Sequence, residues 1–228
     1  MGLNANKAGA EKQFVKQDNL EPATYPARLV QLIDLGLQAQ REFKGQTKPP
    51  VQEIMLTYEL VDTFMKDEAG KDIEDKPRWV NETLPFYGLF ADKARSTQRY
   101  NAFDPNGVYD GDFSKAIGQP INVTVVNNKV GDKVYDNIGA VNPMRAKEAE
   151  KCPKLVNAPV VFDLDAPDVA VFNKLPKFVK EKIVGNLNYQ GSALQKLLGE
   201  KPTPSPATET AKEEAPKAEA VEADDNPY

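Results

Sequence analysis

The alternating run VQEIMLTYELVD, residues 51–62, constrains the fold more than any other feature of the sequence. Between positions 54 and 60 every second residue is apolar, which places on one face Ile54, Leu56, Tyr58 and Leu60. A period of two is typical of a β-strand with one face in a core. Residues 27–36, ARLVQLIDLG, are also apolar and contain β-branched side chains, so the two runs predict an antiparallel pair.

Three further strand-like segments follow, at residues 78–86, 121–128 and 133–141. Residues 91–103 have helical spacing, so a helix is expected between the third and fourth strands. Strand, strand, strand, helix, strand, strand is the chain order of the five-stranded oligonucleotide/oligosaccharide-binding (OB) barrel. Other small barrels and sandwiches give similar orders. The pattern therefore predicts a mainly β fold with some α, with the OB barrel as one candidate.

Composition divides the chain into four parts. Residues 1–23 are an N-terminal arm, and residues 24–145 form the predicted OB core. Residues 146–201 are a helical extension, expected to pack on the core or on a neighbouring subunit, with one helical face made of Leu175, Phe178, Val179 and Ile183. Residues 202–228 are rich in Pro, Ala, Thr and Glu and predict a disordered acidic tail.

The tail accounts for all the net charge of the chain. The whole sequence carries −5, and residues 202–228 alone also carry −5, so the preceding residues are neutral. The tail ends in Asp224, Asp225, Asn226, Pro227 and Tyr228. An aromatic residue and carboxylates on a tether are suited to docking in a partner or to competing with phosphates for a basic groove. A role in solubility alone is the alternative.

The absence of histidine excludes several kinds of chemistry. With no histidine and only one cysteine, Cys152, the chain cannot build a Ser-His-Asp or Cys-His relay or a usual zinc site. No phosphate-binding GxxxxGK[ST] loop occurs either. We therefore expect no cofactor, no metal and no enzymatic activity. A carboxylate-dependent nuclease site remains an alternative, around Asp62, Asp67 and Glu68 or around Asp72, Glu74 and Asp75.

No apolar run approaches the roughly 20 residues of a membrane span. The first 25 residues lack the apolar block of a signal peptide, and Cys152 has no partner for a disulfide. These features predict a protein that is not secreted, has no membrane partner and works in a reducing compartment.

Basic and aromatic side chains recur together along the predicted barrel. Single-stranded nucleic acid is held by cations along its backbone and by aromatic rings on which bases stack. An expected hairpin loop, the third strand, the helix and the last hairpin supply candidates for both contacts. These candidates are Arg41, Lys44, Lys48, Arg78, Trp79, Arg95, Arg99, Tyr100, Lys129, Lys133 and Tyr135.

Several aromatic residues also have a purely structural interpretation. Trp79 shares a polar face with Asn81 and Thr83, but it also suits burial at a barrel end. Tyr135 could be an ordinary half-exposed strand residue, and core packing is expected for Phe86, Phe90 and Phe103. Residues 24–145 hold 15 basic and 17 acidic groups, so DNA binding requires a local basic groove in a neutral body.

The tail and two internal stretches carry a family resemblance. The order of carboxylates, spacer, proline and aromatic at 224–228 resembles the ending Asp-Asp-Asp-Ile-Pro-Phe of bacterial single-stranded DNA-binding proteins, with Asn226 and Tyr228 as departures and one Asp fewer. Residues 25–60 and 162–183 resemble a phage-encoded group of single-stranded DNA-binding proteins. The resemblance implies an OB core, a role in replication or recombination in the cytoplasm of an infected host cell, and no catalysis.

The sequence thus predicts a non-enzymatic, sequence-independent single-stranded DNA-binding protein. Its tail would recruit replication or recombination proteins through Asp224, Asp225, Pro227 and Tyr228, and the extension is a candidate for self-association along DNA. The alternative is a non-enzymatic protein-interaction or virion structural module, in which the tail is a spacer.

Overall fold

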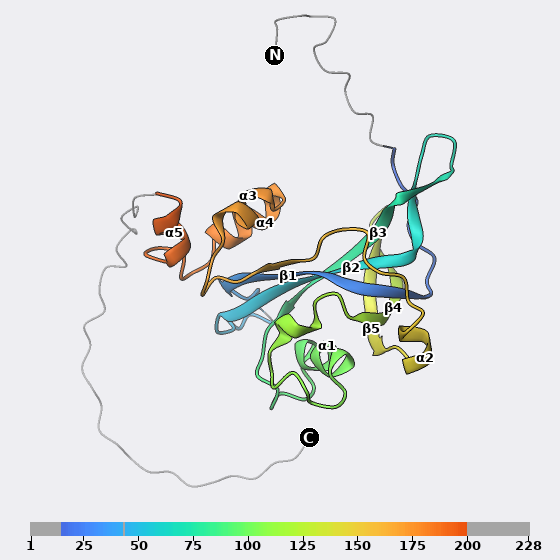
Figure 1. Cartoon of the computed structure of the whole chain (residues 1–228). Coiled ribbons are helices and arrows are strands. Elements are labelled where there is room, and N and C mark those ends of the chain that lie inside the picture. Colours follow the sequence, from blue (N-terminus) through green and yellow to red (C-terminus); the bar gives the residue numbers. More distant parts are fainter. Residues whose placement is uncertain (1–14, 43, 200–228) are drawn as a thin grey trace, which may run out of the picture.

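Strands dominate the computed structural model, which describes residues 15–42 and 44–199 (Figure 1). The strands are β1 (Thr24–Gln38), β2 (Val51–Lys66), β3 (Asp72–Pro85), β4 (Pro120–Val130), β5 (Lys133–Pro143) and β6 (Val160–Phe162). The helices are α1 (Arg95–Phe103), the 3₁₀ helix η2 (Phe113–Ala116), α2 (Ala146–Ala149), α3 (Val169–Lys174), α4 (Lys177–Val184) and α5 (Ala193–Leu197). The prediction of a mainly β fold with additional helices is confirmed. The predictions for residues 1–14 and for the acidic tail lie outside the described residues.

The strands lie in the order β3-β2-β1-β4-β5, each antiparallel to its neighbours, and β6 pairs with β1 in parallel. β1 shares one edge between two partners: its first half pairs with β4 and its second half with β6. A register shift between Leu29 and Gln31 lets the strand change direction there. Among the described residues, β3 and β5 share no ladder, so the sheet is not closed into a barrel.

The inner face of the sheet, together with α1 and η2, buries the larger core. It contains the predicted face of β2 (Ile54, Leu56, Tyr58, Leu60), together with Ile121, Val123 and Val125 of β4 and with Phe103 and Phe113. The prediction of core packing for Phe103 is confirmed. Val134 of β5 is exposed because the β4–β5 hairpin extends beyond the core.

The residues after β5 cover part of the outer face of β1 and β2. Ile33, Leu35 and Met55 form a second core there with Phe162, Phe172, Leu175, Val179, Ile183 and Leu194. The single helical face predicted through Leu175 is wrong in two respects. The chain forms two helices separated at Pro176, and Phe178 is 62% exposed. In the described part of the chain, no helix has the length and apolar character needed to cross a bilayer.

Glu59 of β2 anchors to the sheet the segment around Val156 and Asn157, which crosses the outer face of β2. Its side chain is buried and accepts hydrogen bonds from the backbone N–H of Val156 at 2.6 Å and from Nδ2 of Asn157 at 2.7 Å. A third donor, Nε1 of Trp79, lies 3.1 Å from its Oε2. These donors satisfy both oxygens of the buried carboxylate. On β3 the outward-facing Trp79, Asn81 and Thr83 stay exposed.

Candidate functional site

The edges of β3 and β5 face each other without joining, and two polar bridges connect them. Arg78 of β3 pairs with Asp136 of β5, with 3.5 Å between Nη2 and Oδ2. Further along, Nη2 of Arg95 lies 2.9 Å from Oε2 of Glu82 on β3 and donates to the carbonyl of Ile138 on β5 at 3.1 Å. We call this junction the β3–β5 seam. Side chains, rather than a β-ladder, therefore connect the two edges.

Residues 15–23 close one end of the seam. The backbone carbonyl of Asp18 accepts a hydrogen bond from Nη1 of Arg78 at 2.9 Å. Asp136 accepts from Nδ2 of Asn19 at 2.8 Å and from the backbone N–H of Leu20 at 3.0 Å. This segment holds both members of the ion pair. Arg78, which the sequence suggested as a DNA contact, therefore has a structural role in joining β3, β5 and this segment.

A groove of about 500 Å³ lies along the seam. It is lined by Asn81, Glu82, Thr83, Arg95, Val126, Asn137, Ile138 and Gly139. Most of these groups are neutral, and three of them carry amides or a hydroxyl that can hydrogen-bond to polar edges of a ligand. Gly139 suits this position because a Cβ there would lie 3.0 Å from Cγ1 of Val126. The groove thus combines neutral polar walls with one accessible cation, Arg95.

Glu82 forms a buried charge cluster behind the groove. Arg99 donates to both of its oxygens, through Nε at 2.8 Å and Nη2 at 3.2 Å, and the hydroxyl of Tyr58 donates at 3.0 Å. Burial raises the pKa of Tyr58 well above its ordinary value, and the adjacent Glu82 carboxylate adds to that effect. The prediction that Arg99 lies at the surface is wrong, because its guanidinium is needed to neutralise Glu82 in the core.

Tyr100 was also predicted at the surface and is buried. Its hydroxyl donates to Oδ2 of Asp104 at 3.0 Å and accepts from the backbone N–H of Gly111 at 2.7 Å. Its ring packs edge-on against Phe113, with 5.6 Å between centroids. Tyr100 therefore supports the loop after α1, and neither Tyr100 nor Arg99 presents a surface to DNA in this structure.

Trp79 lies on the uncovered outer face of β3. Trp79 is 40% exposed. It shares the outward face of β3 with the exposed Asn81 and Thr83, as the sequence predicts. The hydrogen bond to Glu59 holds one edge of the indole against the sheet. Neither full burial nor free exposure describes this side chain. A ring fixed at one edge and exposed elsewhere offers a surface on which a base can stack.

The β4–β5 hairpin supplies the predicted aromatic and basic groups beside Trp79. Tyr135 is 47% exposed, and Lys129 and Lys133 lie exposed at the hairpin tip. Tyr135 directly precedes Asp136, whose partner Arg78 directly precedes Trp79, so the two aromatic residues flank the same bridge. Arg95 thus lies in the seam, and Trp79 and Tyr135 each adjoin a bridging residue, whereas Lys129 and Lys133 lie further out at the hairpin tip.

The predicted basic loop lies at the other end of the sheet. β1 begins opposite Thr124, near the β4–β5 hairpin, and ends opposite Val51, where residues 39–50 connect it to β2. Arg41, Lys44 and Lys48 are exposed in this loop, at the end where Figure 1 places α3, α4 and α5. The basic residues predicted in the loop and at the hairpin tip thus lie toward opposite ends of the sheet.

Sequence reasoning missed parts of this surface. It placed Asn81 and Thr83 beside Trp79 but gave them no role, and it did not find Asn137 or Gly139 opposite them. The strand alternation around Tyr135 was the only available signal for Asn137. Core packing was expected for Phe86 and Phe90, yet both are exposed, Phe90 at 93%. The segment FYGLF after β3 has no period from which its burial could be predicted.

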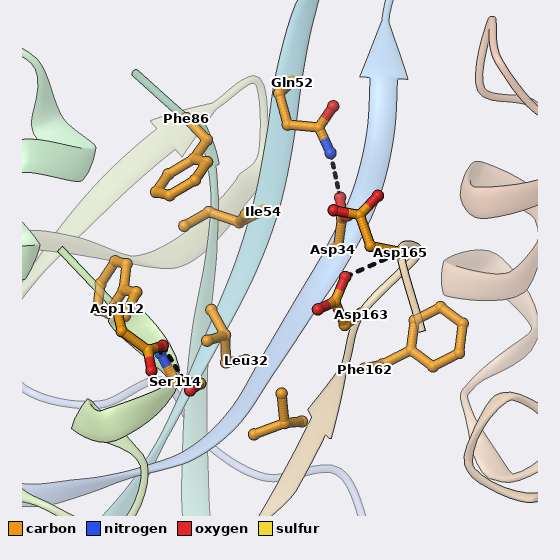
Figure 2. Close-up of a pocket in the computed structure, with 12 residues that line it drawn as sticks. Leu32, Asp34, Gln52, Ile54, Phe86, Asp112, Ser114, Phe162, Asp163 and Asp165 are labelled. Carbon is orange, nitrogen blue, oxygen red and sulfur yellow. Dashed lines mark hydrogen bonds between the residues drawn. The ribbon is translucent and has the colours of Figure 1, made fainter. Parts of the chain in front are cut away.

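A second pocket, of about 420 Å³, is acidic (Figure 2). Its lining includes Asp34, Asp112, Asp163 and Asp165, with Phe86 and Ile54 on an apolar wall. Burial raises the pKa of Asp34, opposed by hydrogen bonds from the backbone N–H of Gly36 and from Gln52. Within the residues that the structure describes, no group of carboxylates could hold a metal ion. The negative charge of this second pocket disfavours the binding of phosphate groups. We therefore take the β3–β5 groove as the candidate site.

Comparison of the chain with models of known protein families and with curated protein sequences gave no match. The functional interpretation therefore depends on the residues and their geometry.

Proposed function

We propose that the protein binds single-stranded DNA without sequence preference, coating and protecting it during phage replication or recombination. The β3–β5 groove is the observation that carries this proposal. It places neutral hydrogen-bonding side chains beside Arg95, and the two strands that form it also carry two half-exposed aromatic residues, Trp79 and Tyr135. Stacking of bases on aromatic rings and attraction of the backbone to cations are the two contacts that hold single strands.

We also infer that the sheet is an OB fold opened at one seam. The order β3-β2-β1-β4-β5 with α1 between β3 and β4 matches that architecture apart from the missing β3–β5 ladder. OB folds bind oligonucleotides on their outer strand face. In this chain Val156 and Asn157 lie over Glu59 of β2, and α3, α4 and α5 pack on another part of that face, which would shift a bound strand toward β3.

The proposed path of the DNA runs along β3, from one end of the sheet to the other. Lys129 and Lys133 stand at the hairpin end, Trp79 and the groove lie between, and the loop at 39–50 stands at the far end. The bases of duplex DNA are enclosed in the base stack and cannot stack on exposed rings such as Trp79. The groove therefore favours unpaired strands.

A titration of labelled oligo-dT tests this function directly. Fluorescence anisotropy should show saturable binding that weakens steeply as salt rises, because phosphate contacts release counterions. A duplex of equal length serves as the matched ligand and should bind more weakly at every salt concentration. Equal affinity for the two ligands, or no binding to either, would contradict the proposal.

Deleting residues 202–228 should tighten oligo-dT binding several-fold at low salt. The tail carries −5, which makes it a tethered competitor for the cations that hold the phosphates. A full-length variant with the tail's Asp and Glu residues changed to Asn and Gln is the matched control and should behave like the deletion. Unchanged or weaker affinity in both proteins would count against self-competition and leave partner recruitment by Asp224, Asp225, Pro227 and Tyr228 as the proposed role.

A further inference from the structure

The charge cluster at the groove has one positive charge in excess. Glu82 is the only carboxylate among the lining residues, and it faces two guanidinium groups, Arg95 and Arg99. The other lining side chains are neutral. The nearby Arg78 and Asp136 neutralise each other across the seam. An anion with a single charge would therefore balance the cluster.

Arg95 has donors that the fold does not use. Both of its contacts, to Glu82 and to the carbonyl of Ile138, come from the same nitrogen, Nη2. In the described part of the chain its Nε and Nη1 make no hydrogen bond, and its side chain is 55% exposed. A guanidinium carries five N–H donors in a planar fork, which matches the oxygens of a phosphate. Arg95 can thus bind an anion with its remaining donors.

Glu82 does not depend on Arg95 for its charge balance. Arg99 contacts both of its oxygens and is only 4% exposed, and Tyr58 adds a hydrogen bond. If Arg95 turned away, Glu82 would keep one buried guanidinium at 2.8 Å. The structure therefore holds one arginine permanently and leaves the other exchangeable.

We propose that Arg95 is a phosphate-binding residue, which holds one phosphodiester of the DNA backbone in the β3–β5 groove through the donors that the fold leaves unused. A phosphodiester carries one negative charge, which matches the excess positive charge of the cluster. Asn81, Thr83 and Asn137 supply neutral hydrogen-bonding groups around the same position. This inference rests on the proposed binding of single-stranded DNA and assigns one contact within it.

Oligo-dT titrations at several salt concentrations test this assignment. In Arg95→Gln, the slope of the logarithm of affinity against the logarithm of salt should fall in magnitude by about 0.7, the value for one phosphate of a single strand. Arg95→Lys keeps the charge and should keep the slope while binding more weakly, because an ammonium cannot form the paired contact. Arg145→Gln, an exposed arginine outside the groove lining, is the matched control and should change neither quantity.

A measurement on the wild-type protein does not depend on the folding of any variant. The Nε–H resonance of Arg95, observed by ¹⁵N NMR, should shift when oligo-dT is added, whereas that of Arg99 should stay in place. An unchanged slope in Arg95→Gln together with an unshifted Arg95 resonance overturns the phosphate assignment alone, provided that the wild type still binds oligo-dT. Absence of binding by the wild type overturns the proposed function as well.

Discussion

Replacing Arg99 with methionine should lower the free energy of unfolding by about 3–5 kcal/mol, the usual cost of removing one partner from a buried ion pair. Glu82 would lose the two hydrogen bonds from Arg99 while remaining 6% exposed. Its remaining partners, Tyr58 and the half-exposed Arg95, supply only part of that compensation. Urea denaturation followed by circular dichroism measures the change.

Arg95→Met is the matched control for this variant. The same carboxylate loses an arginine, but that arginine is 55% exposed, so the cost should be no more than about 1 kcal/mol. The double variant Glu82→Gln, Arg99→Met should recover part of the stability, because it leaves no unpaired buried charge. Equal effects of Arg95→Met and Arg99→Met would show that the two arginines do not differ as the structure requires.

Replacing Trp79 with alanine should weaken oligo-dT binding by about 5- to 150-fold, which corresponds to the loss of one stacked base. The fold should tolerate the change, because Glu59 keeps its hydrogen bonds from Val156 and Asn157. Trp79→Phe retains an aromatic face and should lose less affinity. Anisotropy titration at fixed salt gives all three affinities.

Phe178→Ala removes an aromatic ring that is 62% exposed on α4, away from the groove lining, and serves as the matched control. Its oligo-dT affinity should equal that of the wild type. A loss in Phe178→Ala as large as that in Trp79→Ala would show that the effect is not specific to Trp79 and would not support binding on β3. Full affinity in Trp79→Ala would remove stacking on this ring from the account.

Local pattern was sufficient to predict the strands, because each has a face that repeats every two residues. Ile54, Leu56 and Leu60 point into one core, and the alternation around Trp79 correctly placed Asn81 and Thr83 on the outer side of β3. Alternation cannot predict whether the opposite face of a strand is also covered by another part of the chain. Glu59 is buried as well, since Val156 and Asn157, far along the chain, lie over it.

The errors on α1 have a different physical origin. Arg95 and Arg99 lie four residues apart on one side of the helix, and the sequence offered no reason to separate them. They differ because Glu82, on another strand, draws Arg99 into the core and leaves Arg95 at the groove. The groove itself depends on the meeting of β3 with β5, whose residues are more than 50 positions apart, and no local period reports such a meeting.

The intrinsic fluorescence of Trp79 gives the most direct test that single-stranded DNA occupies the β3 surface at the groove. Trp79 is the only tryptophan in the chain, so the signal comes from one known place. Oligo-dT should quench this emission in a saturable way, with the same midpoint as an anisotropy titration, and a duplex of equal length should quench it weakly. Saturable binding by anisotropy with unchanged Trp79 emission would show that the DNA lies elsewhere and would contradict the account.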